Sequence, residues 1–371
     1  MIIMPETLPS VARYNAHLRI TADWLLQSIQ HGTGGSSAHY SHLRGWSAPY
    51  PETTGYIIPT LIDASAALDD PSLHTSAITL GEWLLGLQDA AGCWPGGLLK
   101  PGSARQPSVF NTAQILDGMT ALARNTGETR WRDAATRGAS WLARNLGADG
   151  CWQIGNYREG VNPSYYAQVA WPMLQVWQLS GDDLVHEATI RVLDRIIARR
   201  APNGVIAGWG FDEDRPAPTH TIAYTLRGLI ESALLLDRWD TYGEPCMAAL
   251  EKLSRKSQLA DGRLPGAYRE DWSAVSWYSC LTGNAQTALC LLRVEQRERD
   301  LRLVNSAARL VDHVCSHQQT ASRPAATRGA VAGSSPPWGR YMFMRYPNWA
   351  AKYHADALMM LAARLQSEAG R

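Results

Sequence analysis

The sequence has little net charge and almost no phenylalanine. Lysine and arginine number 35 against 34 aspartate and glutamate, so the formal charge is only +1. Nucleic-acid binders usually carry a clear basic excess, so this balance argues against a nucleic-acid partner. Phenylalanine occurs 3 times, whereas tryptophan occurs 15 times and tyrosine 14 times. Trp and Tyr combine an apolar body with a polar group, which suits wet, ligand-facing surfaces better than pure core filling.

Long apolar runs and cysteine pairs are also missing. No stretch approaches 18 consecutive apolar residues, so we expect no membrane insertion. The first residues, MIIMPETLPS, show neither a basic segment nor an apolar one, so we expect no secretory leader. The six cysteines form no CxxC pair and no spacing typical of metal ligands. We therefore expect reduced thiols, a cytoplasmic location and neither metal nor other cofactor.

The sequence does contain a repeat with a period of 54 to 58 residues. Four segments share a helix end, a turn with glycine and then an aromatic residue or leucine: LQDAAGCWPGG, LGADGCWQIG, RAPNGVIAGWG and QLADGRLPGAY. Their turn glycines are Gly92, Gly150, Gly204 and Gly262. One further step in each direction reaches position 34 in QHGTGGSS and Gln319 at the end of another helix. Six turns at one period predict six repeated units.

Each unit has the pattern of two antiparallel helices joined by a short turn. The more apolar helices, near 53–69, 109–125, 163–180, 218–237, 279–296 and 347–367, should face inward. The more charged ones, near 9–30, 72–89, 130–146, 182–200, 241–258 and 300–319, should lie outside. Pairing the unpartnered first and last helices closes a ring. The prediction is an all-α fold, an (α/α)6 toroid of about twelve helices in a single domain, 1–371; an open solenoid would need polar end caps.

The long connections all precede inner helices, for example 31–52, 147–162, 201–217, 259–278 and 320–346. They should therefore gather on one face of the ring, around six inner-helix N-termini. Long loops in compact domains are usually functional. Helix N-termini carry unpaired N–H groups and partial positive charge. A funnel for an anionic or hydroxyl-rich ligand is expected there.

The plan resembles the toroids of six-hairpin glycosidases, of uronate lyases and epimerases, and of terpene cyclases. The run from Gln88 to Trp94 fits the QxxxGxW repeat of squalene-type cyclases, but only once in full. A closer resemblance is to a bacterial family found with exopolysaccharide and capsule biosynthesis proteins. It rests on six blocks: PETTGYIIPTLID (51–63), FNTAQILDG (110–118), PSYYAQVAWPML (163–174), PTHTIAYTLRGLIES (218–232), SWYSCLTGNAQTAL (276–289) and RYPNWAAKYHADAL (345–358). This resemblance implies the toroid fold and a role in glycan processing, with no specific reaction.

Two acidic segments are candidates for catalysis in the funnel. Glu52 stands in the first funnel loop and Asp214 in the fourth, in GWGFDEDRPAPTHT. These loops are opposite each other in a ring of six, and a glycosidase needs two carboxyl groups flanking the bond. The structural alternatives are that Glu52 complements the dipole at a helix start and that Asp214 belongs to a solvated loop.

A second candidate set is suited to proton abstraction next to a carboxylate. His220 and Tyr224 are four residues apart and share a helix face, and Arg227 roughly continues it. His or Tyr would take the proton, while Arg227 or Asn111 would neutralise the substrate. The alternatives are a helix-capping role for His220 and an ion pair of Arg227 with Glu231.

Aromatic and polar residues near the loops are candidates for binding a sugar. Flat rings stack on sugar faces, although core packing is the alternative for about half of them. In the last block, Asn348, Lys352 and Asp356 follow at four-residue spacing, and the last two are as well explained by a structural pair. The substrate-binding set comprises Trp46, Tyr50, Tyr56, Asn111, Tyr165, Tyr166, Trp209, Arg227, Trp277, Asn348, Trp349 and Lys352.

The leading hypothesis is an enzyme that cleaves a glycosidic bond in a poly- or oligosaccharide. The alternatives are a uronate-specific lyase or C5-epimerase using His220 and Tyr224, a terpene-cyclase-like enzyme, and a non-catalytic glycan-binding protein. Proteins of a polysaccharide-assembly system are the expected partners. All readings require Glu52, Asp214, His220 and Tyr224 to share one hollow.

Overall fold

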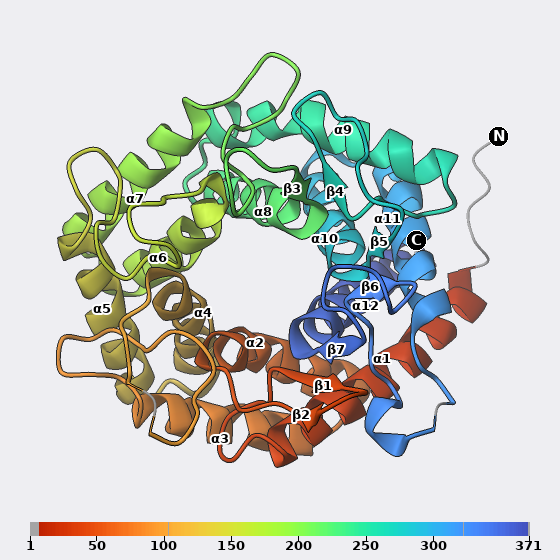
Figure 1. Ribbon diagram of the computed structural model, residues 1–371, viewed down its shortest axis with the longest axis horizontal. Coiled ribbons are helices and arrows are strands. Elements are labelled where there is room, and N and C mark those ends of the chain that lie inside the picture. Colours follow the sequence, from red (N-terminus) through yellow and green to blue (C-terminus); the bar gives the residue numbers. More distant parts are fainter. Residues whose placement is uncertain (1–6, 103, 322, 370–371) are drawn as a thin grey trace.

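Twelve α-helices form two concentric rings in the computed structural model, which describes residues 7–102, 104–321 and 323–369 (Figure 1). The inner ring is made by the even-numbered helices: α2 (Pro51–Leu68), α4 (Val109–Thr126), α6 (Ala167–Ser180), α8 (Thr219–Leu235), α10 (Leu281–Glu298) and α12 (Asn348–Ala369). The outer ring is made by the odd-numbered ones: α1 (Thr7–Gln30), α3 (Pro71–Leu85), α5 (Thr129–Arg144), α7 (Asp183–Ile197), α9 (Glu244–Leu259) and α11 (Leu301–His317). The predicted (α/α)6 toroid is confirmed.

The inner helices are buried and the outer ones amphipathic, as the apolar pattern predicts. In α8, all residues from Thr219 to Ala233 are buried. In α11, by contrast, buried positions such as Val304, Val311 and Val314 alternate with exposed ones. The described helices include none that is long and apolar enough to cross a membrane.

The turn glycines explain why the repeat exists. Each has a positive φ and lies against the backbone or a side chain of the next outer helix. A Cβ on Gly92 would come within 2.6 Å of the Arg137 carbonyl oxygen in α5, and one on Gly262 within 2.0 Å of the Arg309 oxygen in α11. Only glycine fits such a turn without displacing the neighbouring helix.

The sixth turn glycine is Gly329 rather than a residue at position 319. It has φ +85° and lies against the Ile20 carbonyl of α1, so the last unit contacts the first. The expected turn at Gln319 is therefore displaced by ten residues. The Gln319 carbonyl accepts a hydrogen bond from the Gly329 amide at 2.6 Å, so the helix end and the turn glycine lie together although ten positions separate them.

Ring closure involves both ends of the chain. Helix α1 packs against α12 (Figure 1). On the loop face, β1 (His39–Ser41) pairs with β2 (Gly45–Trp46) and with β7 (Arg345–Pro347), so the first long loop is joined to the last. The side chain of Asn348 fastens the same seam by donating to Ser36, Ser37 and Thr53.

Two further strand pairs connect neighbouring loops on this face. They are β3 (Ala217–Pro218) with β4 (Ala267–Tyr268), and β5 (Ser279–Cys280) with β6 (Ser334–Ser335). Three short segments complete the structure: η1 (Ser164–Tyr166) before α6, η2 (Trp239–Gly243) before α9, and η3 (Ala325–Thr327). The loops are thus a connected layer over the N-termini of the inner helices.

Candidate functional site

A cavity of about 300 Å³ lies at the N-terminal ends of the inner helices, under the long loops. We call it the loop-side cavity. Its lining comes from four of the six inner-helix starts and from three loops. The lining residues are Tyr50, Glu52, Tyr56, Ser108, Phe110, Asn111, Tyr157, Tyr165, Phe211, His220, Thr221, Tyr224, Tyr341, Met342 and Trp349.

Glu52 is the carboxyl group among these lining residues. Helix α2 begins at Pro51, directly after Tyr50, which places Glu52 in the first turn, 9% exposed. Burial raises its pKa to about 7, against the opposing effect of a hydrogen bond from the Tyr50 hydroxyl. Among the described residues, no lysine or arginine lines the cavity to offset the desolvation. Glu52 is therefore substantially protonated at neutral pH, as a proton donor must be.

His220 lines the same cavity from the first turn of α8. Burial lowers the pKa of its imidazole to about 3, so the ring is neutral at physiological pH. Its Nδ1 lies 3.9 Å from the Cys280 sulfur, and its ring lies 4.4 Å from that of Tyr341, centroid to centroid. The cavity thus brings together a protonated carboxyl group and an unprotonated imidazole.

Tyrosines form the bottom of the loop-side cavity. Tyr56 and Tyr224 lie within 5.8 Å of the Tyr353 ring, between centroids, and the Tyr224 hydroxyl donates to that of Tyr353. Burial raises the pKa of Tyr224 well above its ordinary value, so this hydroxyl stays protonated. We call Tyr56, Tyr224 and Tyr353 the tyrosine layer. It can donate hydrogen bonds, but it is a poor base.

Aromatic rings make the walls. Phe110 lies 5.5 Å from Tyr165 and 5.7 Å from Tyr224, between ring centroids. Across the cavity, the Trp349 indole donates to the Tyr341 hydroxyl at 2.8 Å. Flat rings around a few polar groups are typical of a small-molecule site.

The sequence hypothesis placed eight of these lining residues in the funnel: Glu52, His220, Tyr224, Tyr50, Tyr56, Asn111, Tyr165 and Trp349. Asn111 is partly committed to structure, because its amide donates to the Pro95 carbonyl at 3.0 Å. Phe110, Phe211 and Tyr341 were missed. The motif FNTAQ and the aromatic-rich loop segment YMFMRY carried the signal for Phe110 and Tyr341.

The expected placement of Asp214 is wrong. It is exposed and lines a separate cavity of about 190 Å³ with Trp209 and Glu270. The loop that carries it is fixed by ion pairs, since Asp212 contacts Arg158, and Glu213 contacts Arg199 at 2.6 Å. The loop therefore turns Asp214 toward solvent rather than toward Glu52. The four proposed catalytic residues do not share one hollow.

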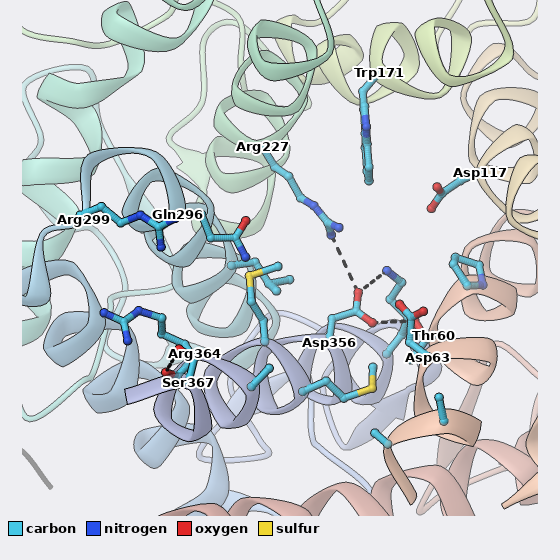
Figure 2. A pocket seen from close by; sticks show the side chains of 18 residues that line it. Thr60, Asp63, Asp117, Trp171, Arg227, Gln296, Arg299, Asp356, Arg364 and Ser367 are labelled. Atoms are coloured by element: carbon cyan, nitrogen blue, oxygen red, sulfur yellow. Dashed lines mark hydrogen bonds and ion pairs between the residues drawn. The ribbon is translucent and has the colours of Figure 1, made fainter. Parts of the chain in front are cut away.

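Arg227 and Lys352 are also absent from the loop-side cavity. They line a larger cavity of about 840 Å³ toward the C-terminal ends of the inner helices, which we call the far-side cavity (Figure 2). Seven residues of α-helix advance about 10 Å along the axis. Arg227 therefore shares a helix face with His220 but lies below the tyrosine layer.

The remaining expected binding residues have other surroundings. Trp46 stacks on His31 at 4.9 Å, and Trp209 packs edge-on against Trp272 at 5.5 Å. Tyr166 is buried beside Trp152, and Asn348 is buried at the ring seam. Trp277 is 55% exposed. None of these five lines the loop-side cavity.

A group with metal-ligand chemistry lies elsewhere, at the junction of α1, α11 and α12. One ligand atom from each of His17, Cys315 and His354 lies within 4.8 Å of the others. The Nδ1 of His17 is bonded to Gln318 at 2.5 Å, and the Cys315 sulfur lies 3.9 Å from Nε2 of His354. The Nδ1 of His354 has no hydrogen-bond partner among the described residues, and none of the three residues lines either cavity.

No protein-family model matches the chain, and no curated protein sequence matches it. Solved structures do. A heparin-specific unsaturated glucuronyl hydrolase aligns with a TM-score of 0.76 at 12% identity, over 96% of this chain and 98% of its own. The cellobiose 2-epimerase of Bacillus thermoamylovorans B4167 gives 0.76 at 11%, over 95% and 99%. An α-amylase from Clostridium perfringens gives 0.67 at 11%, over 97% and 99%.

At such low identity these likenesses show the fold. The predicted resemblance to toroid enzymes is confirmed at that level, whereas the resemblance to the exopolysaccharide-associated family stays a prediction. Similar proteins in these comparisons thus include a hydrolase, an epimerase and an amylase on one (α/α)6 scaffold.

Proposed function

We propose that this chain is a sugar-processing enzyme that uses Glu52 as a proton donor in the loop-side cavity. The observation that carries the proposal is the burial of Glu52 in an aromatic-walled cavity, with a pKa of about 7. A carboxyl group that remains protonated near neutral pH is suited to general-acid catalysis. The similar solved structures support the sugar part, since their names describe enzymes acting on saccharides.

The cavity favours a neutral sugar over a uronic acid. A uronate would bring a carboxylate into a space that no described lysine or arginine lines, beside the group Glu52 that is itself desolvated. Burying an unpaired charge is costly. Tyrosine hydroxyls, the Asn111 amide and neutral His220 can instead bond sugar hydroxyls. The geometry therefore gives little support to the uronate-specific lyase or C5-epimerase.

The reaction that we propose is cleavage of a glycosidic bond. Glu52 gives its proton to the departing oxygen as the C–O bond breaks, and a water oxygen adds to the anomeric carbon. Neutral His220 receives the proton of that water. A two-carboxylate glycosidase would need a second acid across the sugar. Glu52 is the sole carboxylate among the described lining residues, so His220 takes that place.

The same observation favours a second candidate, epimerisation of a neutral sugar. An acid and an unprotonated imidazole in one cavity can remove a proton from carbon next to a carbonyl and return it on the other face. Two of the similar solved structures are cellobiose 2-epimerases. The hydroxyl-rich lining, by contrast, does not favour terpene cyclisation, which needs an apolar cavity.

Product analysis separates these reactions. The protein would be incubated with neutral disaccharides and trisaccharides, including cellobiose and maltotriose, and with uronate oligosaccharides in D2O. New reducing ends indicate hydrolysis, C2 epimers containing deuterium indicate epimerisation, and absorbance of unsaturated uronates indicates a lyase. We expect turnover of a neutral sugar. Binding of these sugars with no product in any channel would contradict catalysis and favour the non-catalytic glycan-binding protein.

A further inference from the structure

The far-side cavity is a second concave space on the ring axis, and the proposed reaction does not use it. Its lining comes from all six inner helices, on the side of the tyrosine layer away from Glu52. At about 840 Å³ it is nearly three times the size of the loop-side cavity, and it is open to solvent along its rim. Its size is in the range of ligand pockets.

The cavity contains acids and cations in near balance. Asp63, Asp117 and Asp356 come from α2, α4 and α12. Asp356 accepts from Lys352 at 2.5 Å and from Thr60 at 2.7 Å, and Asp117 accepts from the Gln175 amide at 3.1 Å. Arg299 and Arg364 lie in the lining, and Arg364 pairs with Glu295 at 2.8 Å. Such a mixture creates no strong field of one sign.

Arg227 is buried, yet two of its donors are not used. Arg227 is 8% exposed, and its Nε and Nη1 have no hydrogen-bond partner among the described residues. Its nearest carboxylate oxygens, on Glu231 and Asp356, are 4.0 Å away, which is too long for a hydrogen bond. Figure 2 shows the guanidinium pointing into the cavity. Buried donors without acceptors are costly, so a ligand oxygen here would be favourable.

Trp171 adds an apolar surface beside these polar groups. It lines the cavity, and the Arg227 guanidinium carbon lies 4.8 Å from its ring centroid (Figure 2). Fixed donors, fixed carboxylate acceptors and a flat ring in one space match a molecule with many hydroxyls and apolar C–H faces. Acids and cations both line the cavity, so its charge favours neither an anion nor a cation.

We propose that the far-side cavity is a second binding site for a neutral saccharide. Asp63 and Asp117 accept hydrogen bonds from its hydroxyls, Arg227 donates to them, and Trp171 covers one sugar face. Ligand chemistry here is derived from the cavity itself, so the proposal stands or falls separately from catalysis in the loop-side cavity. It gives the ring two saccharide sites on one axis, separated by the tyrosine layer.

Methionine methyl groups can report the two cavities separately. Met359 and Met360 line the far-side cavity and Met342 lines the loop-side cavity. The full chain carrying Glu52→Gln, which suppresses turnover, would be labelled with [methyl-13C]methionine and titrated with maltotriose and with cellotriose. Resonances are assigned by Met→Leu substitution. We expect saturable shifts at Met359 and Met360 with at least one trisaccharide.

Two variants test the assigned contacts. Asp63→Asn changes an exposed side chain and should leave folding intact, and Trp171→Leu removes the flat ring. Each should weaken the response of Met359 and Met360 about tenfold without altering that of Met342. Inorganic phosphate and trimethylammonium serve as charged probes. Shifts with either ion but neither sugar, or sugar shifts unchanged in both variants, would overturn the proposal.

Discussion

The two cavities on the ring axis are lined by inner helices of the same ring, but they differ in how their charged groups are compensated. In the loop-side cavity a single carboxyl group, Glu52, is desolvated without a cation and keeps its proton to about pH 7. In the far-side cavity Asp356 is paired with Lys352 and lies near Arg227. Glu52 in the loop-side cavity therefore keeps its proton, whereas the acids of the far-side cavity are compensated by nearby cations.

The position of a residue along an inner helix determines which of the two cavities its side chain lines. On α8 the order is His220, then Tyr224, then Arg227, which runs from the neutral cavity through the tyrosine layer to the charged one. On α2 the same passage runs from Glu52 through Tyr56 to Asp63. The tyrosine layer keeps the cations away from Glu52. We infer that this separation is what allows the carboxyl group to act as an acid.

The largest expected effect is on turnover. Glu52→Gln should lower kcat by about 10³-fold, because a positioned general acid contributes about 10² to 10⁴. The amide keeps the shape of the side chain and still accepts from Tyr50. Circular dichroism should show an unchanged fold, and Glu251→Gln on the outer surface is the matched control, with activity within twofold of wild type. A Glu52→Gln enzyme with near-normal kcat would remove Glu52 from the mechanism.

Asp214→Asn completes this test of the acid. The sequence hypothesis gives it a large effect, whereas its exposure in a separate cavity predicts less than a threefold change in kcat. A loss comparable with that of Glu52→Gln would mean that the 211–216 loop reaches the sugar during turnover.

The sequence predicted those features of the fold and of the two cavities that have a periodic signal. The helix pattern and the turn glycines located all twelve helices to within a few residues, because burial repeats at 3.6 residues and a Cβ at Gly92 or Gly262 would strike the next helix. The inner-helix starts identified Glu52, His220 and Tyr224. The spacing of residues along one helix predicts which face they share, but not which cavity along the ring axis they reach. Arg227 and Lys352 were therefore assigned to the wrong cavity. Loop conformation set by ion pairs, as at Asp214, has no periodic signal.

The second prediction compares stability at the two ends of the axis. Arg227→Met should destabilise the fold by about 3 kcal/mol, since removing one partner leaves buried carboxylates less compensated. Denaturant unfolding at pH 8 measures this change. Arg255→Met, which breaks an exposed pair with Glu251, should change stability by less than about 1 kcal/mol. Equal effects of the two substitutions would show that the far-side charges are as solvated as surface ones.

Glu52→Gln should raise the stability of the fold at pH 8, whereas Arg227→Met lowers it. The folded chain holds the Glu52 proton to about pH 7, whereas the unfolded chain releases it near 4.5. The contribution of Glu52 to the free energy of unfolding is therefore fully present below pH 4.5 and is lost as the pH rises toward 7. The variant should be more stable than wild type by about 3 kcal/mol at pH 8 and similar to it at pH 4. Denaturant unfolding at both values, with no gain at pH 8, would contradict the raised pKa.

The activity profile is the third prediction. With Glu52 as the acid, kcat/KM should fall about tenfold per pH unit above pH 7, because only the protonated carboxyl reacts. His220 remains neutral down to about pH 3, so it should add no acidic limb between pH 4 and 7. Initial rates from pH 4 to 9 provide the measurement. An alkaline limb near pH 4.5 would mean that Glu52 is as solvated as an ordinary surface glutamate.

The smallest expected effect concerns the wall of the neutral cavity. Trp349→Phe removes the indole donor that holds the Tyr341 hydroxyl at 2.8 Å, and the Tyr341 ring in turn packs at a tilt against that of His220. One hydrogen bond is worth about 1 kcal/mol, so stability should drop by about that amount and kcat/KM by about fivefold. Trp338→Phe, at a position 57% exposed, is the matched control and should change neither. If Trp349→Phe altered stability but not kcat/KM, Tyr341 would be a wall of the cavity without a part in positioning His220. The neutral cavity would then depend on Glu52 and the tyrosine layer alone.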